Sequence, residues 1–373
     1  MILYKTLHPS LFICLILLLS ACNREKTSQL NSPGTDTGRN FLHQPVFEIS
    51  QVSSSPVITI GHPGTVENKY GFEGGRAVKI NDEYHIFTTE MYGNPLWTKT
   101  RLAHWKSRDG IAWERISGLF ESTGDFTGTD PRAALWSPMP TYDAGKGRWI
   151  LTYVAYNSRP NTDSAWYRNF NGKIWMAISQ KPGYDGIDGP YLDSLVILQP
   201  GRESDSWEGL MGTDSFYPFP VNGTWMAFYG SSPESVGLAS SPDLYGPWTR
   251  ATQQNPVRRY IENPIVSRLE DGRYVALFDG CGENRKIGYM VSEDGNHWSK
   301  EIFFDLENFV KPWWGLTRTP LGLIQESNNT FTVFFTAYNK DFYTIPDVWK
   351  TNDDGVYDGY YASVGMFRLK LIR

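Results

Sequence analysis

The stretch Asn222-Gly223-Thr224-Trp225-Met226-Ala227-Phe228 joins a tight turn to a strand rich in aromatic residues. Asn-Gly is a strong signal for a two-residue β-hairpin, and the residues after it favour β-structure. Four other segments repeat this pattern of a turn followed by an aromatic strand, namely residues 81–87, 145–151, 271–277 and 328–334. Their unequal spacing is typical of propeller blades with variable loops rather than of a strict solenoid.

A second repeated element follows the hairpin in several of these units. Ser107-Arg108-Asp109-Gly110-Ile111-Ala112-Trp113 is nearly copied at residues 292–298, and residues 241–248 are a looser version. Catalytic residues would not recur from blade to blade, so we interpret these segments as turns between a third and a fourth strand. The repeats predict an all-β fold, a single five-bladed β-propeller of about four strands per blade. Residues 46–60 and 362–371 are expected to close the ring.

The composition agrees with this fold class. The chain has 14 Trp, 21 Tyr and 20 Phe, which favour strands, and 35 Gly and 23 Pro, which interrupt them. A hydrophobic content of 40% and a charged content of 20% exclude a disordered chain. The net charge of -5 argues against nucleic acid as a partner. We expect a monomer.

The N-terminus is predicted to be a targeting segment. Lys5 precedes the apolar run at residues 11–19, which is too short for the about 20 residues of a membrane span but typical of a signal peptide. Leu19-Ser20-Ala21-Cys22 resembles the bacterial lipobox, which implies that Cys22 is lipidated. An ordinary secretory signal with a chance Cys is the alternative.

These features divide the chain into three predicted parts: a lipoprotein signal peptide at 1–21, a flexible tether at 22–45 and the catalytic propeller at 46–373. We expect membrane contact through the lipid anchor alone, in the outer membrane. No acidic run follows Cys22, which favours the periplasmic side over the cell surface.

The cysteines and histidines do not predict a disulfide or a metal site. Cys281 has no partner once Cys14 leaves with the signal peptide and Cys22 carries the lipid. The histidines after residue 22 show no metal-ligand spacing, and there is no Gly-rich phosphate loop. We therefore expect no cofactor and no metal ligands, while a structural calcium ion in the channel stays open.

Candidate chemistry lies at the start of the inner strands. The first strand of each blade lines the central channel, so the residues before the five hairpins should meet in one funnel. Three of these five places carry a carboxylate, namely Glu73, Asp214 and Glu262. The other two carry Trp136 and Arg318.

Three short motifs at these places resemble a known group of enzymes. Trp136-Ser137-Pro138, Thr213-Asp214-Ser215 and Glu262-Asn263-Pro264 are similar to blade motifs of five-bladed propeller glycoside hydrolases of the family 43, 62, 32 and 68 type. The first blade departs from this pattern, because family 43 has Asp where this chain has Glu73. The fifth blade has Arg318 and lacks the His that those enzymes often use. The departures indicate a separate, related family.

The resemblance implies a catalytic role for three carboxyl groups. Glycoside hydrolysis needs one protonated and one ionised carboxyl group beside the scissile bond. By blade position, Glu262 is the expected general acid and Glu73 the base or nucleophile, while Asp214 raises the pKa of the acid by like-charge repulsion. Glu90 ends the second strand of blade one and is a rival for Glu73.

Further residues are expected to contact the substrate. Arg76 shares a strand face with Glu73 only if Gly74-Gly75 forms a bulge. Asp130 and Arg132 lie in the loop before blade two, where a simple ion pair between them would fit equally well. Trp136 could stack on a sugar ring, and Arg318 with Arg76 or Arg132 could bind an acidic sugar. The full predicted set is Arg76, Glu90, Asp130, Arg132, Trp136, Asn263 and Arg318.

The sequence thus predicts a lipid-anchored, exo-acting glycoside hydrolase that trims plant or algal oligosaccharides. A propeller-type glycoside phosphorylase is one alternative, and it would need a basic phosphate cluster beside the acid. A non-catalytic glycan-binding lipoprotein is the other, and it would not need three carboxylates at equivalent positions. A separation of about 5–10 Å between Glu73 and Glu262 would support hydrolysis. The sugar, the linkage and the choice between retention and inversion stay open.

Overall fold

The computed structural model describes residues 45–372 except 164–167, 232–233, 283, 347 and 349. The signal peptide, the lipidation of Cys22 and nearly all of the tether lie outside the described residues and stay predictions. Among the residues described, no helix is both long enough and apolar enough to cross a bilayer.

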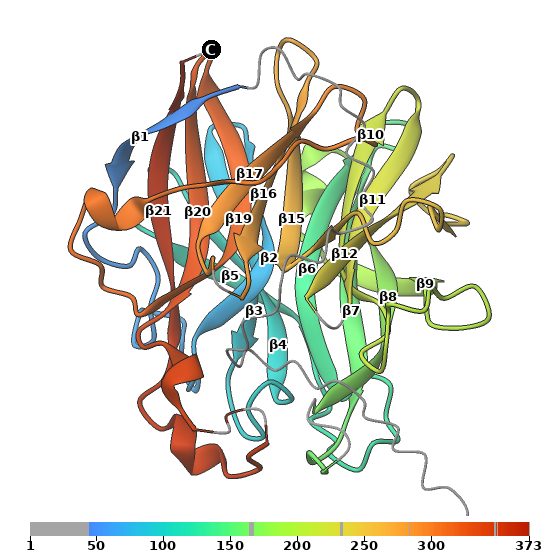
Figure 1. The fold of residues 1–373 in the computed structure, drawn as a ribbon, viewed down its shortest axis with the longest axis vertical. Helices are drawn as coiled ribbons and strands as arrows, with labels where there is room; N and C mark the ends of the chain where they lie inside the picture. The colour runs from blue at the N-terminus through green and yellow to red at the C-terminus, as the bar shows by residue number, and fades with distance from the viewer. Residues whose placement is uncertain are drawn as a thin grey trace, which may run out of the picture. The chain divides into compact units, whose positions relative to one another are not determined.

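The strands form five antiparallel sheets, which are the blades (Figure 1). Blade one contains β2 (Phe72–Ile80), β3 (Glu83–Met91), β4 (Thr100–Ser107) and β5 (Glu114–Glu121). Blade two contains β6 (Ala134–Asp143), β7 (Arg148–Ser158), β8 (Asn169–Ser179) and β9 (Tyr191–Leu198). Blade three contains β10 (Asp214–Val221), β11 (Thr224–Ser231), β12 (Ser235–Ser241), β13 (Thr249–Arg250) and β14 (Arg258–Arg259).

Blade four contains β15 (Ile261–Arg268), β16 (Tyr274–Gly280), β17 (Ile287–Ser292) and β18 (Ile302–Phe303). Blade five contains β19 (Leu316–Ser327), β20 (Thr330–Tyr338), β21 (Ala362–Leu371) and β1 (Phe47–Val52). The connections hold short 3-10 helices, η1 (Tyr184–Asp188), η2 (Leu306–Asn308), η3 (Phe342–Thr344) and η4 (Asp354–Tyr357).

The inner strands of the blades contact one another in a ring. β2 contacts β6, β6 contacts β10, β10 contacts β15, β15 contacts β19, and β19 returns to β2. This arrangement confirms the predicted all-β, five-bladed propeller, in which each first strand lies beside the first strands of both neighbouring blades.

Blade five combines strands from distant parts of the sequence. β1 pairs antiparallel with β21, so that Phe47 lies opposite Leu371 and Val52 opposite Phe367. In Figure 1 the blue β1 accordingly lies beside the red β21. The predicted closure of the ring is confirmed.

Both repeated elements take the structures expected of them. Asn222 and Gly223 have φ angles of 47° and 82°, the left-handed pair that a tight hairpin needs between β10 and β11. In the second repeat, Ser107 Oγ accepts from the Gly110 amide at 2.9 Å, and Asp109 Oδ1 accepts from two further amides. The turn directs Trp113 into the core, where it packs edge-on against Phe334 of blade five at 5.2 Å.

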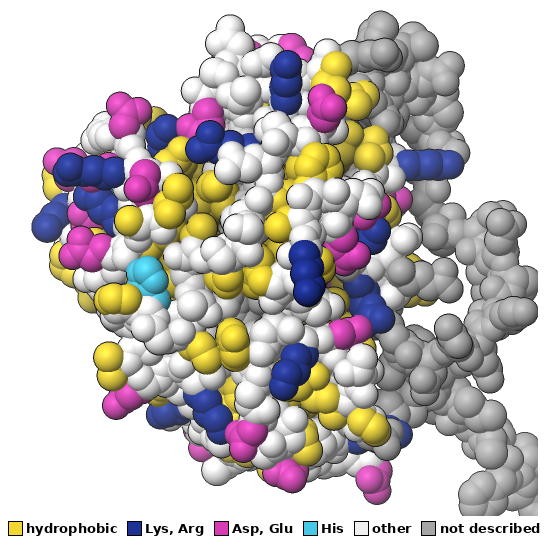
Figure 2. Space-filling model, turned by 90° about the vertical axis from the view of Figure 1, so that its left-hand side faces the viewer, with side chains coloured by type: hydrophobic (Ala, Val, Ile, Leu, Met, Phe, Trp, Pro, Cys, Tyr) yellow, Lys and Arg dark blue, Asp and Glu magenta, His cyan; other side chains and the backbone are white. Residues whose placement is uncertain are grey.

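Many aromatic side chains are buried in apolar clusters that join neighbouring blades. The largest apolar cluster joins Phe228 of blade three, Phe278 of blade four and Phe335 of blade five, all of them fully buried. On the face shown in Figure 2, by contrast, apolar side chains are scattered among charged groups of both signs. With a single free cysteine among the residues described, burial of apolar surface is the main stabilising term.

Candidate active site

Each inner strand has an irregularity in its pairing near its first residues. The register with the second strand shifts between Glu73 and Gly75, Trp136 and Met139, Asp214 and Phe216, Glu262 and Ile265, and Thr317 and Pro320. These shifts mark bulges at equivalent places in all five blades. Because bulges redirect side chains and are common beside active sites, they single out the positions that the sequence proposed.

The residue after the predicted one has a positive φ in four blades. Gly74, Ser137, Ser215 and Asn263 have φ angles of 67°, 52°, 43° and 52°. Three of them are not glycine, so the surrounding structure holds them in a region that costs about 1–3 kcal/mol each. A Cβ atom at Gly74 would also lie 2.7 Å from Ser137 Oγ, so an alanine there would force this hydroxyl group to move.

The centre of the site is the guanidinium of Arg318. Its Nε donates to Glu73 Oε1 at 2.8 Å and its Nη2 donates to Glu262 Oε2 at 3.0 Å. Its Nη1 lies 3.4 Å from Oδ2 of Asp279. Since Glu73 and Glu262 bind one small planar group, their carboxyl groups are closer than about 10 Å, the upper limit for the carboxyl pair of a glycosidase.

The two glutamates differ in exposure and in their other partners. Glu73 Oε2 accepts from the Tyr338 hydroxyl at 2.7 Å, so both of its oxygens are occupied. The side chain of Glu262 is 28% exposed, against 11% for Glu73. Glu262 is therefore the more accessible to a substrate.

Asp214 lies close enough to Glu262 for the charge of Glu262 to affect the pKa of Asp214. Burial raises the pKa of Asp214, the hydrogen bonds from Tyr156 and Ser215 oppose this effect, and the negative charge of Glu262 adds to it. The resulting pKa is about 6. A protonated carboxyl group near neutral pH is what a site for general acid catalysis requires.

Two acidic residues at this site were missed by the sequence reasoning. Asp279 on β16 is 1% exposed, and burial raises its pKa to about 7, with Arg318 opposing and Glu262 adding to the shift. Asp279 lies opposite Glu262 in the hairpin of β15 and β16, so counting strand pairs back from the turn could have found it. Glu234, just before β12, has its pKa raised to about 7 by burial and by Glu262. Its sequence neighbourhood carries no comparable signal.

Asn263 joins the carboxylates to neighbouring blades. Its amide nitrogen donates to Asp279 Oδ1 at 3.1 Å and to Thr319 Oγ1 at 3.2 Å. Its oxygen accepts from Ser215 at 3.0 Å and from Tyr217 at 2.7 Å. The amide is thus engaged with blades three, four and five, and it orients acidic groups rather than facing a substrate.

Glu90 does not join the carboxyl groups around Arg318. In the pairing of β2 with β3, Thr89 lies opposite Glu73 and Glu90 lies opposite Phe72, so Glu90 faces the other side of the sheet. It is fully buried, and its oxygens accept from Arg101, Arg115 and Trp105. The structure indicates a structural role within blade one.

Asp130 and Arg132 also lie apart from Arg318 and do not pair with each other through their side chains. Arg132 forms an ion pair with Asp193 on the outer strand β9 at 2.9 Å and lies over the Trp175 ring. Asp130 accepts from the Arg132 backbone amide at 2.8 Å and orders the loop.

Arg76 and Trp136 lie on inner strands with partners of their own. The bulge at Gly74 is present and places Arg76 on the same face as Glu73. Its guanidinium donates to Pro140 O at 3.4 Å and Thr141 Oγ1 at 3.3 Å, and burial lowers its pKa to about 10. Trp136 Nε1 donates to the Trp97 carbonyl at 3.0 Å.

Comparisons with known protein families and with curated sequences give no match. Among solved structures, the family 117 glycoside hydrolase Zg3597 of the marine bacterium Zobellia galactanivorans has 14% identity over 87% of this chain and 90% of its own, with a TM-score of 0.58. The α-L-arabinofuranosidase PaAbf62A of Podospora anserina, in complex with cellotriose, has 12% identity over 86% and 97%, with a TM-score of 0.59.

The catalytic domain of the GH62 α-L-arabinofuranosidase of Coprinopsis cinerea has 13% identity over 86% of this chain and 96% of its own, with a TM-score of 0.57. At these identities the likeness concerns the fold. It confirms that this chain shares the propeller of glycoside hydrolases, as the blade motifs indicated.

Proposed function

We propose that this protein is a glycoside hydrolase in which Glu262 and Glu73 form the catalytic carboxyl pair. The observation that carries the proposal is their convergence on Arg318 from blades four and one. Two carboxyl groups held at this separation, one more exposed than the other, match what cleavage of a glycosidic bond requires.

Glu73 is assigned as the base or nucleophile. Both of its oxygens accept hydrogen bonds from cationic or phenolic donors, which suits an ionised carboxylate fixed in one orientation. Glu262 is assigned as the general acid because its side chain is accessible and lies among further acidic groups. The raised pKa values of Asp214 and Asp279, about 6 and about 7, support a cluster that retains protons near neutral pH.

Glu234 is a second candidate for the proton donor. It is half-buried, its pKa is raised to about 7, and the charge of Glu262 contributes to that shift, so the two groups are neighbours. Glu262 is preferred because its position relative to Glu73 is fixed through Arg318, whereas Glu234 has no such bond to the pair among the contacts described.

We favour hydrolysis over a phosphorylase or a glycan-binding function, and the interactions of Arg318 and Arg285 are one reason. A phosphorylase needs cationic groups free to bind phosphate, but Arg318 is bonded to carboxylates and Arg285 pairs with Asp341 at 3.1 Å. A binding protein gains nothing from carboxyl groups that hold protons near neutral pH. Because Arg318 is already bonded to Glu73 and Glu262, we do not expect it to bind the carboxylate of an acidic sugar.

For the substrate, we propose exo-acting cleavage of plant or algal oligosaccharides by a protein tethered through Cys22. Support comes from the structural neighbours, which include arabinofuranosidases and a marine bacterial hydrolase, although those activities belong to those proteins. A screen of the purified protein against released plant and algal oligosaccharides, acidic ones included, would identify the sugar. Release of one terminal unit per cleavage is the expected pattern.

Glu262→Gln tests the catalytic assignment. A general acid contributes roughly 10²–10⁴-fold, so turnover of a substrate with a poor leaving group should fall by that factor. An aryl glycoside with a good leaving group should be cleaved by Glu262→Gln but not by Glu73→Gln. Glu293→Gln, on an exposed turn of blade four, is the matched control.

Melting curves must first show that the variants fold. Undiminished activity of Glu262→Gln on the poor leaving group would overturn the assignment, and the same measurement on Glu234→Gln would then locate the acid. Failure of the wild-type protein to cleave any glycoside in the screen would overturn the proposed function itself.

A further inference from the structure

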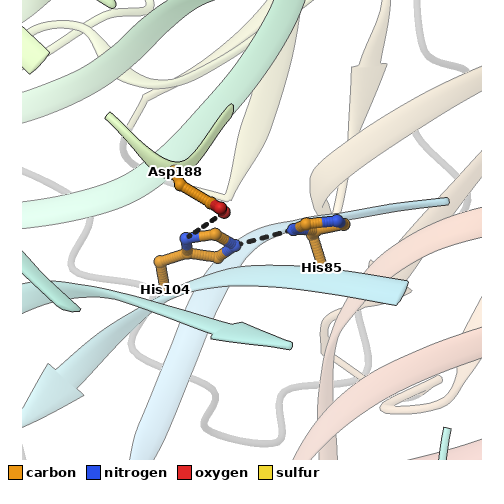
Figure 3. A group of neighbouring side chains, drawn as sticks. All are labelled: His85, His104 and Asp188. Atoms are coloured by element: carbon orange, nitrogen blue, oxygen red, sulfur yellow. Dashed lines mark hydrogen bonds and ion pairs between the residues drawn. The ribbon is translucent and has the colours of Figure 1, made fainter. Parts of the chain in front are cut away.

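Two histidines and an aspartate lie together outside the carboxylate site (Figure 3). His85 is on β3, His104 is on β4 and Asp188 ends η1 of blade two. His85 pairs with Lys106 and His104 pairs with Phe87 in the antiparallel register, so the two imidazoles project from the same face of blade one. The cluster therefore joins blade one to the connection before β9.

The distances within the cluster leave one buried atom without a partner. His85 Nδ1 and His104 Nε2 are 2.9 Å apart and share a hydrogen bond. His104 is fully buried, yet its Nδ1 has no hydrogen-bond partner among the described residues and lies 3.9 Å from Asp188 Oδ1. A buried polar atom in this state calls for a water or an ion that completes it.

The separation of 3.9 Å fits an ion better than a direct bond. It is too long for a hydrogen bond, whose heavy atoms lie about 2.7–3.2 Å apart. Two ligands that each lie about 2.0–2.1 Å from a tetrahedral zinc ion are about 3.3–3.4 Å apart, so the Asp188 oxygen would have to move about 0.5 Å closer to His104 Nδ1. Donor atoms from all three residues lie within 4.8 Å of one another, so a small adjustment of the Asp188 side chain is sufficient.

The surroundings hold both histidine rings in place. The two side chains are buried, with His85 3% and His104 0% exposed. Phe87 stacks on the His104 ring at 4.3 Å and fixes its plane. Lys106, the nearest cation in the register, is bonded to Glu83 at 2.6 Å.

The hydrogen bond between the two rings completes the arrangement. If His104 donates its Nε2–H to His85 Nδ1, the lone pair of His104 Nδ1 is directed toward Asp188. Histidines that bind metals usually donate their other ring N–H in this way, and the acceptor fixes the tautomer. The Asp188 side chain is 40% exposed, which gives an ion and its water ligands access to the site.

We propose that His104 and Asp188, with His85 as the orienting partner, bind a divalent transition-metal ion. Imidazole with carboxylate suits zinc and its neighbours in the first transition row, whereas calcium and magnesium prefer oxygen ligands alone. The ion would tie blade one to η1 of blade two. Sequence spacing could not indicate this site, because only the register of β3 and β4 brings His85 beside His104.

The test is a zinc titration of the purified full-length chain without an affinity tag, after removal of metals with a chelator. We expect one equivalent of Zn²⁺ to bind, with a rise in the melting temperature. Asp188→Asn should weaken binding at least about tenfold, and His85→Gln should weaken it by about 10–100-fold. Asp185→Asn, on the same short helix and exposed, should bind zinc as the wild type does.

Asp188 is partly exposed, so its replacement leaves the fold intact and keeps the proposal falsifiable. Anomalous diffraction at the zinc edge should place the ion beside His104 Nδ1. The proposal is overturned if the wild type binds no zinc at about 1 mM, if Asp188→Asn and Asp185→Asn bind equally well, or if the ion lies elsewhere. None of these outcomes depends on the glycosidase assignment.

Discussion

Replacing Arg318 by methionine would leave Glu73, Glu262 and Asp279 facing one another without a counter-ion. The Arg318 side chain is 15% exposed, so water can replace little of the lost guanidinium. Removing one partner from a buried ion pair costs about 3–5 kcal/mol of unfolding free energy. For about 330 folded residues, an unfolding entropy of about 0.7 kcal/mol/K follows from the per-residue average, and Arg318→Met should lower the melting temperature by about 4–7 °C.

The loss should depend on pH with a definite sign. Arg318 opposes the rise in the pKa of Asp279 that burial causes, so without the cation this pKa rises further above its unfolded-state value. Groups of this kind stabilise the fold below the unfolded-state pKa and lose that contribution as pH rises through the folded-state pKa. The pKa of Asp279 is already raised to about 7 in the wild type. The stability contribution is therefore lost between about pH 4 and pH 7 or above. The difference between wild type and variant should therefore be small at pH 4.5 and full at pH 8.

Thermal and urea unfolding at pH 4.5, 6 and 8 would measure this difference. Arg368→Met on β21 is the matched control, because Arg368 is exposed and should change stability by less than about 0.5 kcal/mol. A loss below about 1 kcal/mol at pH 8, or an equal loss at pH 4.5 and pH 8, would refute the view that Arg318 holds the carboxylates together.

Two further substitutions test neighbouring parts of the site. Gly74→Ala should destabilise the protein by about 1–2 kcal/mol because the φ angle at this residue is positive. The contact at 2.7 Å between the new Cβ atom and Ser137 Oγ should add to this cost. The variant should also be less active, because Glu73 is displaced. Gly223→Ala also has a positive φ but meets no atom within 4 Å, so an equal melting temperature for the two variants would contradict the steric argument. Asp279→Asn removes a carboxyl group whose raised pKa makes the wild type lose stability as pH rises from about 4 to about 7. Its melting temperature should fall less than that of the wild type between pH 5 and pH 8, and parallel pH profiles would exclude this role for Asp279.

The sequence was sufficient for features whose signals are local. The turn at Asn222-Gly223 and the Ser-Asp turn at residues 107–113 each depend on a few adjacent residues, and the structure confirms both. Their repetition was enough to predict the number of blades. The starts of the inner strands followed from counting back along single strands, which is why Glu73 and Glu262 were found as neighbours.

Features that depend on strand register could not be predicted in the same way. The position of Glu90 at the end of a strand predicts a substrate contact or a rival for Glu73, but the register with β2 turns its side chain to the opposite face. Arg318 was expected to face the substrate, yet its partner Glu73 lies 245 residues away in the sequence. Asp279 lies on a second strand, and only its pairing with Glu262 brings it to the site, so the starts of the first strands do not indicate it.

The pairing of β1 with β21 has a consequence for how the protein folds during its synthesis on the ribosome. β1 is made before any blade, and its partner β21 is made after all the other strands of the fold. During synthesis the first four blades can form from residues that are close in the sequence. β1 meanwhile remains unpaired, and its free edge could bind a strand of another chain. The completion of the propeller is thus delayed until its two most distant strands meet, and a chain halted before residue 362 would remain open and prone to aggregate.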